Sequence, residues 1–598
     1  MLLDRVAGYV ADAAGASVDH IKVVLLLFAA VPLSLVYPYL PPSTRSPLVH
    51  IYSLALVTVF CCFTLPWTNG FLQLLASSIV TWCIVKVGVK QKWGASMQWI
   101  VFAVALGHLT FKQVPDALNI IAFMRDPTFS KIDISGSHLV LVMKLHSFAC
   151  SVYDGQRPLE ELDETQKASR IPEVPGLLPF LGYAFFMPSM LVGPSFTYAS
   201  YDAFTSHRLF AKEQAAGGKT PPKVVDPTVI PPGRRRKAAK RLLTGVFFLV
   251  IYSLYGGQYN MARLLDSSFV KGKSFWAKFV FMNIAGAFAR FKYYAVWCIA
   301  ESSCILSGLG YNPRTGHYDA SRNLRIRNIE LAPNFKVLLD SWNMNANVWL
   351  RECIYKRLAK KGRKPGFKST QITFIVSALW HGVNPCYLMT FVLGGFCQAV
   401  NRSLRAGVRP FALPPGALTT PSSIGTPVPM PKVDVQPGDK SAPPPRNLPK
   451  VKLQPPPQTP IKTLYDIVGT ICTLTTLNFA VVPFLLLDAR LSIRAWREVD
   501  FYALYMIFIP FLLLNVFGGV GVLKKYQKRR DRKRTEREEE QERRRIEWEA
   551  REERKRQLRG EGLPSLGLDV EEMLREEEEE ERRAAAAAAG QSEGKKEL

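Results

Sequence analysis

One histidine stands out among the eight of this 598-residue chain because it lies at the end of an apolar run. His381 occurs in SALWHGVNPCY, next to Trp380, with Ser377 one helical turn before it and Asn384 three residues after it. A neutral imidazole can accept the proton of a hydroxyl group near pH 7, which makes such a residue a candidate general base. From the residues alone, a catalytic group and a structural histidine both remain possible.

A second polar cluster lies in DSWNMNANVWLRECIYKRLAKKGRK, residues 340–364. Asn343, Asn345 and Asn347 alternate with other residues there, and asparagine favours turns and helix caps. We therefore predict a turn that leads into an amphipathic helix. This helix ends in a basic patch of Lys356, Arg357, Lys360, Lys361, Arg363 and Lys364. The patch could contact anionic lipid at the membrane surface or bind the phosphates of a charged cofactor.

Two carboxylates lie in or beside apolar segments. Glu301 occurs in YYAVWCIAESSCILSGLGYN, and Asp154 lies at the end of a segment in KLHSFACSVYDGQRP. Ionisable groups in a membrane segment are costly and need a partner, so each is a candidate for a structural contact or a functional role. His108 and His146 lie in apolar contexts without polar neighbours, and we expect structural roles for them. No Walker or HExxH motif occurs, and no metal site is expected.

The elements that must position these residues are membrane helices. Hydrophobic residues make up 48% of the chain and occur in blocks long enough for a span of about 20 residues. The blocks lie at 21–40, 47–67, 71–89, 97–111, 175–193, 241–257, 275–308, 370–402, 461–487 and 501–523. Backbone polar groups must be satisfied internally in lipid. We therefore predict an all-α polytopic membrane protein with roughly ten or eleven transmembrane or re-entrant helices.

The net charge of +27 is concentrated in loops and in the C-terminal tail. GRRRKAAKR (233–241) precedes one apolar block, and KKYQKRRDRKR (524–534) follows the last one. Because basic loops favour the cytosolic side, both stretches are predicted to be cytosolic and close to anionic headgroups. No recognition module accompanies the charge, so nucleic acid is not an expected partner.

Composition divides the chain into four regions. Residues 1–402 form a membrane core that contains the candidate site, and 403–460 form a proline-rich insert that is predicted to be disordered. Residues 461–523 supply the last membrane helices, and 524–598 form a charged tail. Lys595 and Lys596 near the end are similar to a cytosolic dilysine retrieval signal, with a luminal KDEL-like signal as the alternative. The predicted location is the endoplasmic reticulum membrane.

Several motifs together resemble the membrane-bound O-acyltransferase (MBOAT) family, most of all its lysophospholipid acyltransferase branch of the broad-specificity fungal type. They are KLHSFACSVYDG, MLVGPSFTY, AESSCILSGLGYN, SWNMNANVWL and SALWHGVNPCY. Asn343 precedes His381 by 381 − 343 = 38 residues, which matches the family spacing, whereas Cys386 replaces a common glycine. The resemblance implies an MBOAT-type helical bundle with His381 as the catalytic histidine and Asn343 as its partner. Glu301 and Asp154 match further family positions.

The implied reaction transfers an acyl chain from acyl-CoA, as a co-substrate, to the free hydroxyl of a lysophospholipid. His381 would remove the hydroxyl proton, Asn343 would orient the substrate or stabilise the oxyanion, and no acyl-enzyme would form. Trp380, Lys356 and Arg357 are expected to support or bind substrate, and no permanently bound cofactor is expected. The alternatives are an MBOAT that acylates a protein or a neutral lipid, and a non-catalytic transporter, although no internal repeat is visible.

Overall fold

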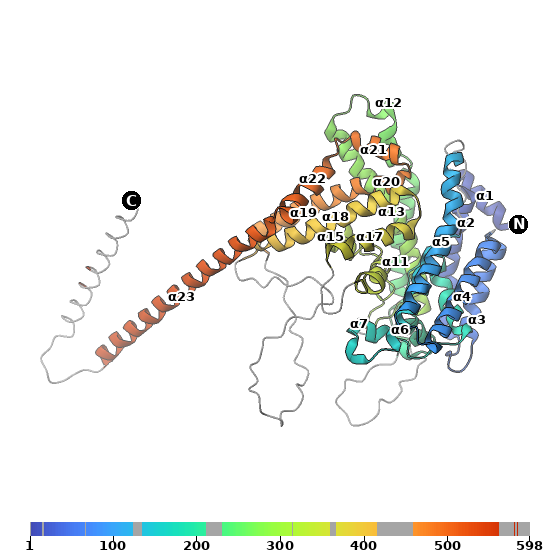
Figure 1. The fold of residues 1–598 in the computed structure, drawn as a ribbon, viewed down its shortest axis with the longest axis horizontal. Helices are drawn as coiled ribbons and strands as arrows, with labels where there is room; N and C mark the ends of the chain where they lie inside the picture. The colour runs from blue at the N-terminus through green and yellow to red at the C-terminus, as the bar shows by residue number, and fades with distance from the viewer. Residues whose placement is uncertain are drawn as a thin grey trace, which may run out of the picture. The chain divides into compact units, whose positions relative to one another are not determined.

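The computed structural model describes residues 2–14, 17–65, 67–123, 134–210, 230–313, 315–358, 366–414 and 458–560, together with Glu579 and Arg583 (Figure 1). Within these ranges the chain is helical, and an isolated bridge between Asn312 and His317 is the only β-type pairing. The chain divides into two compact units. The first comprises Met1–Ala406 and Pro460–Val520, and the second comprises Gly407–Thr459 and Gly521–Leu598.

The helices follow one another in chain order. They are α1 (Leu2–Ala14), α2 (Val18–Leu33), α3 (Leu48–Thr58), α4 (Thr68–Lys90), α5 (Ser96–Phe123), α6 (Ser135–Gly155), α7 (Glu164–Ser169), α8 (Leu177–Ala184), α9 (Met187–Met190), α10 (Tyr198–Thr205), α11 (Arg234–Tyr255) and α12 (Ser267–Val270). They continue with α13 (Phe275–Ser307), α14 (Ile326–Glu330), α15 (Phe335–Leu339), α16 (Met344–Trp349), α17 (Phe367–His381), α18 (Pro385–Gly407), α19 (Pro460–Ala480), α20 (Val482–Leu486), α21 (Ala489–Arg497), α22 (Tyr502–Phe511) and α23 (Gly519–Gly560).

The prediction of an all-α polytopic membrane protein is confirmed. Over the described ranges, four helical segments are long and apolar enough to cross a bilayer: Val18–Tyr39, Thr68–Lys90, Arg234–Tyr255 and Pro460–Leu486. A fifth span is possible if α21 and the segment Tyr502–Val516, which meet at 91°, act as one broken span. This number is smaller than the predicted ten or eleven because the other apolar blocks form helices that are shorter, bent or more polar. Helix α13, for example, carries Arg290, Lys292 and Glu301.

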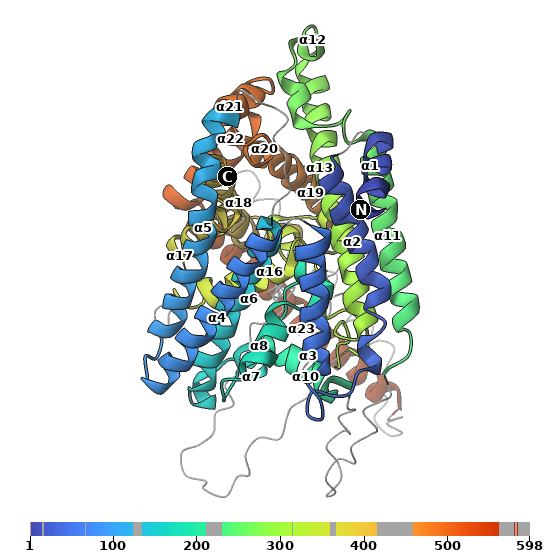
Figure 2. The same ribbon diagram turned by 90° about the vertical axis from the view of Figure 1, so that its right-hand side faces the viewer.

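Helix α13 is the central element of the first unit. Helices α2, α11 and α19 all pack against it, and Figure 2 shows α2, α11 and α13 side by side. The approach of α11 depends on Gly245, since a Cβ atom there would lie 2.7 Å from the Ile299 side chain and 2.9 Å from the Ala295 carbonyl oxygen. A small residue at this contact lets the two backbones come close without loss of packing.

A buried polar network joins α13 to α14 and α19. The Arg290 guanidinium donates to both carboxylate oxygens of Glu330, at 2.8 and 2.6 Å, and to Asn478 Oδ1 at 2.6 Å. The Tyr294 hydroxyl donates to the same carboxylate at 2.6 Å. A buried ion pair is stable only when its remaining hydrogen-bonding groups are also satisfied, and this network meets that requirement. It therefore fixes the position of α19 on α13.

Helix α6 is the most deeply buried helix near the candidate site. Lys144, which is fully buried, donates to the carbonyl oxygens of Tyr183 at 3.1 Å and Ala184 at 3.3 Å and to Ser189 Oγ at 3.0 Å. The three acceptors match the three N–H donors of the ammonium group. Two of these acceptors are carbonyl oxygens at the C-terminal end of α8, where the helix dipole favours a positive charge. Lys144 thus fixes α6 to α8 and α9, and among the described residues no carboxylate pairs with it.

The second unit contains the charged segment after the last apolar block. Residues 519–560 form one continuous helix, α23 (Figure 1), with ion pairs such as Arg534–Glu538 at 2.6 Å one turn apart. The helix begins against residues 407–410, where Gln527 donates to the Gly407 carbonyl oxygen at 2.7 Å. Of the predicted insert, residues 403–407 continue α18, and residues 415–457 lie outside the described ranges.

The close contact between α13 and α19 gives a first prediction. A Cβ atom at Gly286 would overlap with the side-chain amide of Asn478 and disturb its bond with Arg290. We expect Gly286→Ala to destabilise the protein by about 1–3 kcal/mol, as overpacked cores generally do. The measurement is the thermal unfolding midpoint in detergent. Gly107→Ala is the matched control, because a Cβ atom there meets open space on helix α5. Equal midpoints for both variants would contradict this account of the contact.

Candidate active site

Two tryptophans attach the segments of the candidate site to one face of α6. Trp349 ends α16 and donates its indole N–H to His146 Nδ1 at 3.2 Å, while Trp380 donates to the Leu139 carbonyl oxygen at 3.0 Å. Leu139 and His146 are about two turns apart on α6 and therefore share a face. The two indole rings also contact each other, with centroids 5.8 Å apart. This arrangement brings together the segments that carry Asn343 and His381.

His381 is the last residue of α17 and is enclosed by aromatic rings. Its ring centroid lies 4.6 Å from Trp380, 5.9 Å from Tyr387, 5.1 Å from Phe391 and 5.0 Å from Phe484. The side chain is half-buried, and within the described ranges neither ring nitrogen has a hydrogen-bond partner. The imidazole is therefore held in place by ring contacts while both nitrogens remain available to a ligand.

Asn343 is placed differently from the two asparagines that follow it. It precedes α16 in a left-handed conformation, with φ of 41°, which asparagine adopts more easily than most residues. Asn345 Nδ2 donates to Asn323 Oδ1 at 3.0 Å, and Asn347 Nδ2 donates to the Leu339 carbonyl oxygen at 2.8 Å. The half-buried Asn343 amide makes no hydrogen bond within the described part of the chain. Two asparagines thus build the turn, and the third presents a free amide.

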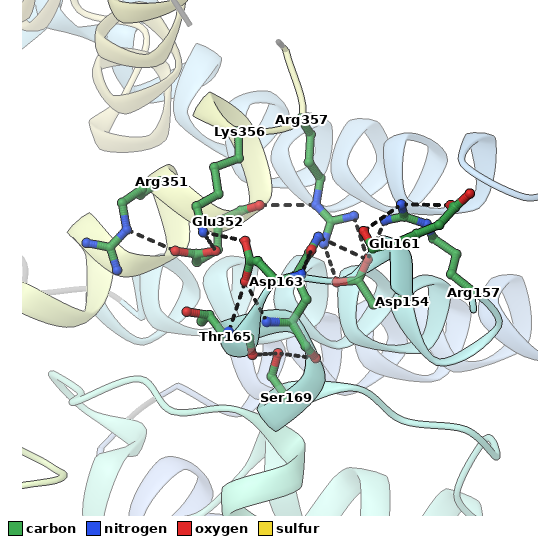
Figure 3. Close-up of polar contacts among 11 residues, drawn as sticks. Asp154, Arg157, Glu161, Asp163, Thr165, Ser169, Arg351, Glu352, Lys356 and Arg357 are labelled. Carbon is green, nitrogen blue, oxygen red and sulfur yellow. Dashed lines mark hydrogen bonds and ion pairs between the residues drawn. The ribbon is translucent and has the colours of Figure 1, made fainter. Parts of the chain in front are cut away.

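Asp154 and Arg357 form a buried ion pair at the opposite end of α6 from Leu139 (Figure 3). The guanidinium donates to both carboxylate oxygens, at 3.2 and 2.6 Å, and its Nε donates to the Glu352 carbonyl oxygen at 3.1 Å. The exposed side-chain fraction is 2% for Asp154 and 9% for Arg357. Arg357 follows the π-helical segment Leu350–Tyr355, so the pair ties the end of the site segment to α6.

Lys356 is also occupied by carboxylates. Its ammonium lies 2.7 Å from Asp163 and 2.6 Å from Glu352 (Figure 3). Partial burial tends to raise the pKa of Asp163, but the bond from Lys356 and the backbone N–H groups of Gln166 and Thr165 outweigh it, so the pKa falls below its ordinary value. Asp163 therefore stays ionised at neutral pH and keeps Lys356 paired.

These contacts bear on the predicted basic patch. Lys356 and Arg357 already have carboxylate partners, which does not favour a role in binding the phosphates of a cofactor. The remaining residues of the patch, Lys360, Lys361, Arg363 and Lys364, lie outside the described ranges. A phosphate-binding role of Lys356 and Arg357 stays a prediction, and the structure gives both a structural role.

Glu301 forms an ion pair with Arg241, as a carboxylate in apolar surroundings requires. Its Oε2 lies 2.5 Å from Arg241 Nη2, and its side chain is 1% exposed. Arg241 is on α11 and Glu301 is on α13, so the ion pair holds these two long helices in register near their contact at Gly245. The structure thus assigns Glu301 a contact between helices.

Comparison with known proteins identifies the family. The family model of MBOAT, the membrane-bound O-acyltransferase family, matches residues 91–423, a stretch that includes Asp154, Glu301, Asn343 and His381. The chain belongs to this family. Its members' reaction makes the protein an O-acyltransferase, and the predicted resemblance is confirmed.

Relatives cover most of this MBOAT protein. It is similar to the "Lysophospholipid acyltransferase" of Schizosaccharomyces pombe, with 32% identity over 86% of this chain and 90% of the relative. The Saccharomyces cerevisiae protein of the same name is 29% identical over 83% of this chain and 74% of the relative. The human "Membrane-bound glycerophospholipid O-acyltransferase 2" is 27% identical over 83% of this chain and 85% of the relative.

Sequence reasoning missed the part that His146 plays in this acyltransferase. We expected a structural histidine without polar company, but its Nδ1 accepts the Trp349 N–H and its ring packs against Phe102, with centroids 4.7 Å apart. Trp349 is 203 positions further along the chain, so no local pattern could have indicated the bond. His146 is therefore a positioning residue for the site.

The Asp154–Arg357 pair gives a second prediction. Asp154→Asn leaves the buried Arg357 without its counter-charge, and we expect a loss of about 3–5 kcal/mol of stability. Arg357→Ala leaves Asp154 with the longer contact to Arg157, at 3.6 Å, and should cost somewhat less. The double variant Asp154→Leu with Arg357→Met should recover most of that loss, because apolar pairs often replace buried ion pairs well. The measurement is the unfolding midpoint of each purified variant.

Arg351→Ala is the control for that prediction. Arg351 contacts Glu352 at 2.9 Å, but its side chain is 37% exposed, and we expect its removal to cost less than about 1 kcal/mol. If the double variant is stable but requires far more acyl-CoA for half-maximal rate, then Arg357 binds the CoA phosphates and its structural assignment is wrong.

His146 gives a third prediction. His146→Ala removes the acceptor of the Trp349 N–H, and we expect the acyl-transfer kcat to fall at least tenfold with little change in KM, because small misplacements of reacting groups are costly. His146→Asn places an amide oxygen close to the position of Nδ1 and should restore most of the rate. Equal kcat values for His146→Ala and wild type would show that the indole bond does not position the site.

Proposed function

We propose that this O-acyltransferase transfers an acyl chain from acyl-CoA to the free hydroxyl of a lysophospholipid. The observation that carries the proposal is the half-buried imidazole of His381 in its aromatic enclosure, with no hydrogen bond to either nitrogen from the described residues. The names of the fungal relatives support a lysophospholipid as the acceptor. A CoA thioester is the donor that the proposed chemistry requires.

The chemistry follows from the two free polar groups. A hydroxyl is a weak nucleophile at neutral pH, so His381 accepts its proton as the oxygen attacks the thioester carbonyl carbon. The Asn343 amide donates to the oxygen on which negative charge develops, a contact worth about 3 kcal/mol in comparable sites. The carbon–sulfur bond then breaks, and the CoA sulfur leaves with the proton that His381 had taken up.

We further propose that transfer is direct. An acyl-enzyme needs a serine or cysteine activated by a neighbouring base. In the described ranges no serine or cysteine hydrogen-bonds with His381, and Cys386, five residues further on, is buried. The lysophospholipid hydroxyl is therefore the nucleophile in the only chemical step.

The same proposal places the protein in the endoplasmic reticulum membrane with its C-terminus in the cytosol. The basic stretches 233–241 and 524–534 favour the cytosol for both segments, and Lys595 and Lys596 match a retrieval signal there. Acyl-CoA is polyanionic and approaches from that side, whereas the lysophospholipid enters from within the bilayer.

A membrane assay with labelled acyl-CoA and a panel of lysophospholipids tests the proposal. We expect wild type to acylate at least one of them and His381→Ala to lose at least 100-fold in rate, the usual minimum for a general base. His317→Ala is the control, since His317 is exposed in a loop outside the site. Unfolding midpoints must match between the variants.

Other results of this assay would overturn the proposal. Equal transfer by wild type and His381→Ala would exclude His381 as the base. Transfer only to a neutral lipid or a protein would move the acyltransferase to another acceptor class. Recovery of a covalent acyl-protein after rapid quenching would exclude direct transfer.

In the same assay, the Asn343→Gly variant tests the role of the side-chain amide separately from the conformation of the turn. Glycine adopts the left-handed conformation of residue 343 without strain, so the turn should persist while the amide is lost. We expect a rate about 100-fold lower than wild type. A fully active Asn343→Gly variant would show that the amide takes no part in the reaction.

A further inference from the structure

The outward face of α11 carries a shallow, open groove, lined by residues of this one helix, that the acyl-transfer site does not use. The groove has a volume of about 690 Å³, and its lining includes Arg236, Lys240, Leu243, Thr244, Phe247 and Phe248. Basic residues form one end and apolar residues form the rest. Leu243 is 68% exposed and Phe247 is 58% exposed, so this stripe is not covered by the first unit's own helices.

The basic residues of α11 separate into two sets. Arg241 points toward α13 and pairs with Glu301. Arg236 and Lys240 are exposed on the groove side, and neither forms an ion pair within the described ranges. The Thr244 hydroxyl donates to the Lys240 carbonyl oxygen at 2.8 Å, which leaves its methyl group to the groove. The groove thus offers two basic side chains, unpaired among the described residues, next to a mostly apolar strip.

The length of the strip fits one membrane leaflet. From Lys240 to Phe248, the last residue of the lining, the helix rises about 12 Å at 1.5 Å per residue. One leaflet contributes half of a hydrocarbon core of about 30 Å. A ligand with its anionic group at Arg236 and Lys240 would therefore lay an acyl chain along Leu243 and Phe247 toward the bilayer midplane.

We propose that this groove is a binding site for one anionic diacyl glycerophospholipid of the cytosolic leaflet, separate from the acyl-transfer site. Its headgroup contacts Arg236 and Lys240, and one acyl chain lies along Leu243, Phe247 and Phe248. A soluble anion would leave the apolar strip uncovered. A second copy of the chain, packed through the same face, would bring the basic pairs near each other without compensating charge.

Native mass spectrometry of the full-length protein in detergent tests this proposal. Delipidated protein is titrated with dioleoylphosphatidylserine or dioleoylphosphatidylcholine, and one-to-one complexes are counted. We expect wild type to bind the serine lipid about tenfold more tightly at low salt, because each basic residue near a headgroup adds to anionic lipid binding. The double variant Arg236→Ala with Lys240→Ala should lose this preference.

Two further variants locate the site. Arg235→Ala removes an exposed charge of the same helix that does not line the groove, and it should keep the preference. Phe247→Ser should weaken binding of both lipids. The proposal fails if wild type binds both lipids equally, or if Arg235→Ala has the same effect as the double variant. It also fails if wild type is a dimer through the α11 face and Phe247→Ser dissociates it.

Discussion

The site depends on two indole N–H groups that donate into one face of α6. Trp349 bonds to His146, Trp380 bonds to the Leu139 carbonyl oxygen, and the indole rings contact each other. Each bond is short-range and directional, so the backbone next to each tryptophan is fixed as well. His381 adjoins one tryptophan, and the turn of Asn343 precedes the other by less than two helical turns. Loss of either bond would loosen the attachment of these two segments to α6.

The lipid bilayer, as an apolar solvent, explains why the other ionisable side chains have hydrogen-bonding or charged partners. A charge in a bilayer needs a counter-charge or several hydrogen bonds, and the structure supplies them. Glu301 meets Arg241 and Asp154 meets Arg357, whereas Lys144 relies on carbonyl and hydroxyl oxygens. His381 differs from these ionised groups, since its nitrogens have no hydrogen-bond partner in the described ranges. An imidazole without a hydrogen-bond partner either lowers the stability of the protein or takes part in its function.

Local sequence predicted much of this because membrane helices and functional motifs leave local signals. Apolar blocks indicated the helical bundle, and the resemblance to the MBOAT family singled out His381 and Asn343, whose catalytic roles stay predictions. Sequence could not show which of three asparagines has a free amide, since that depends on Asn323 and Leu339 elsewhere in the chain.

Contacts between residues far apart in the chain determined features that local sequence could not predict. The pairing of Arg357 with Asp154 joins residues 203 positions apart, and Phe484 reaches His381 from beyond the proline-rich stretch. Over the described ranges, fewer helices than apolar blocks are long and apolar enough to cross a bilayer alone, because the other blocks form shorter, bent or more polar helices. Helix α13 is an example, with buried charges along a 33-residue helix.

The most direct test of the central claim is a distance. A cryo-electron microscopy structure with a lysophospholipid and a non-reactive acyl-CoA thioester analogue would place the free hydroxyl relative to His381. We predict that the hydroxyl oxygen lies about 2.6–3.2 Å from a His381 ring nitrogen, which is the reach of a general base. A hydroxyl bonded to another residue, with His381 out of reach in the occupied site, would contradict the account.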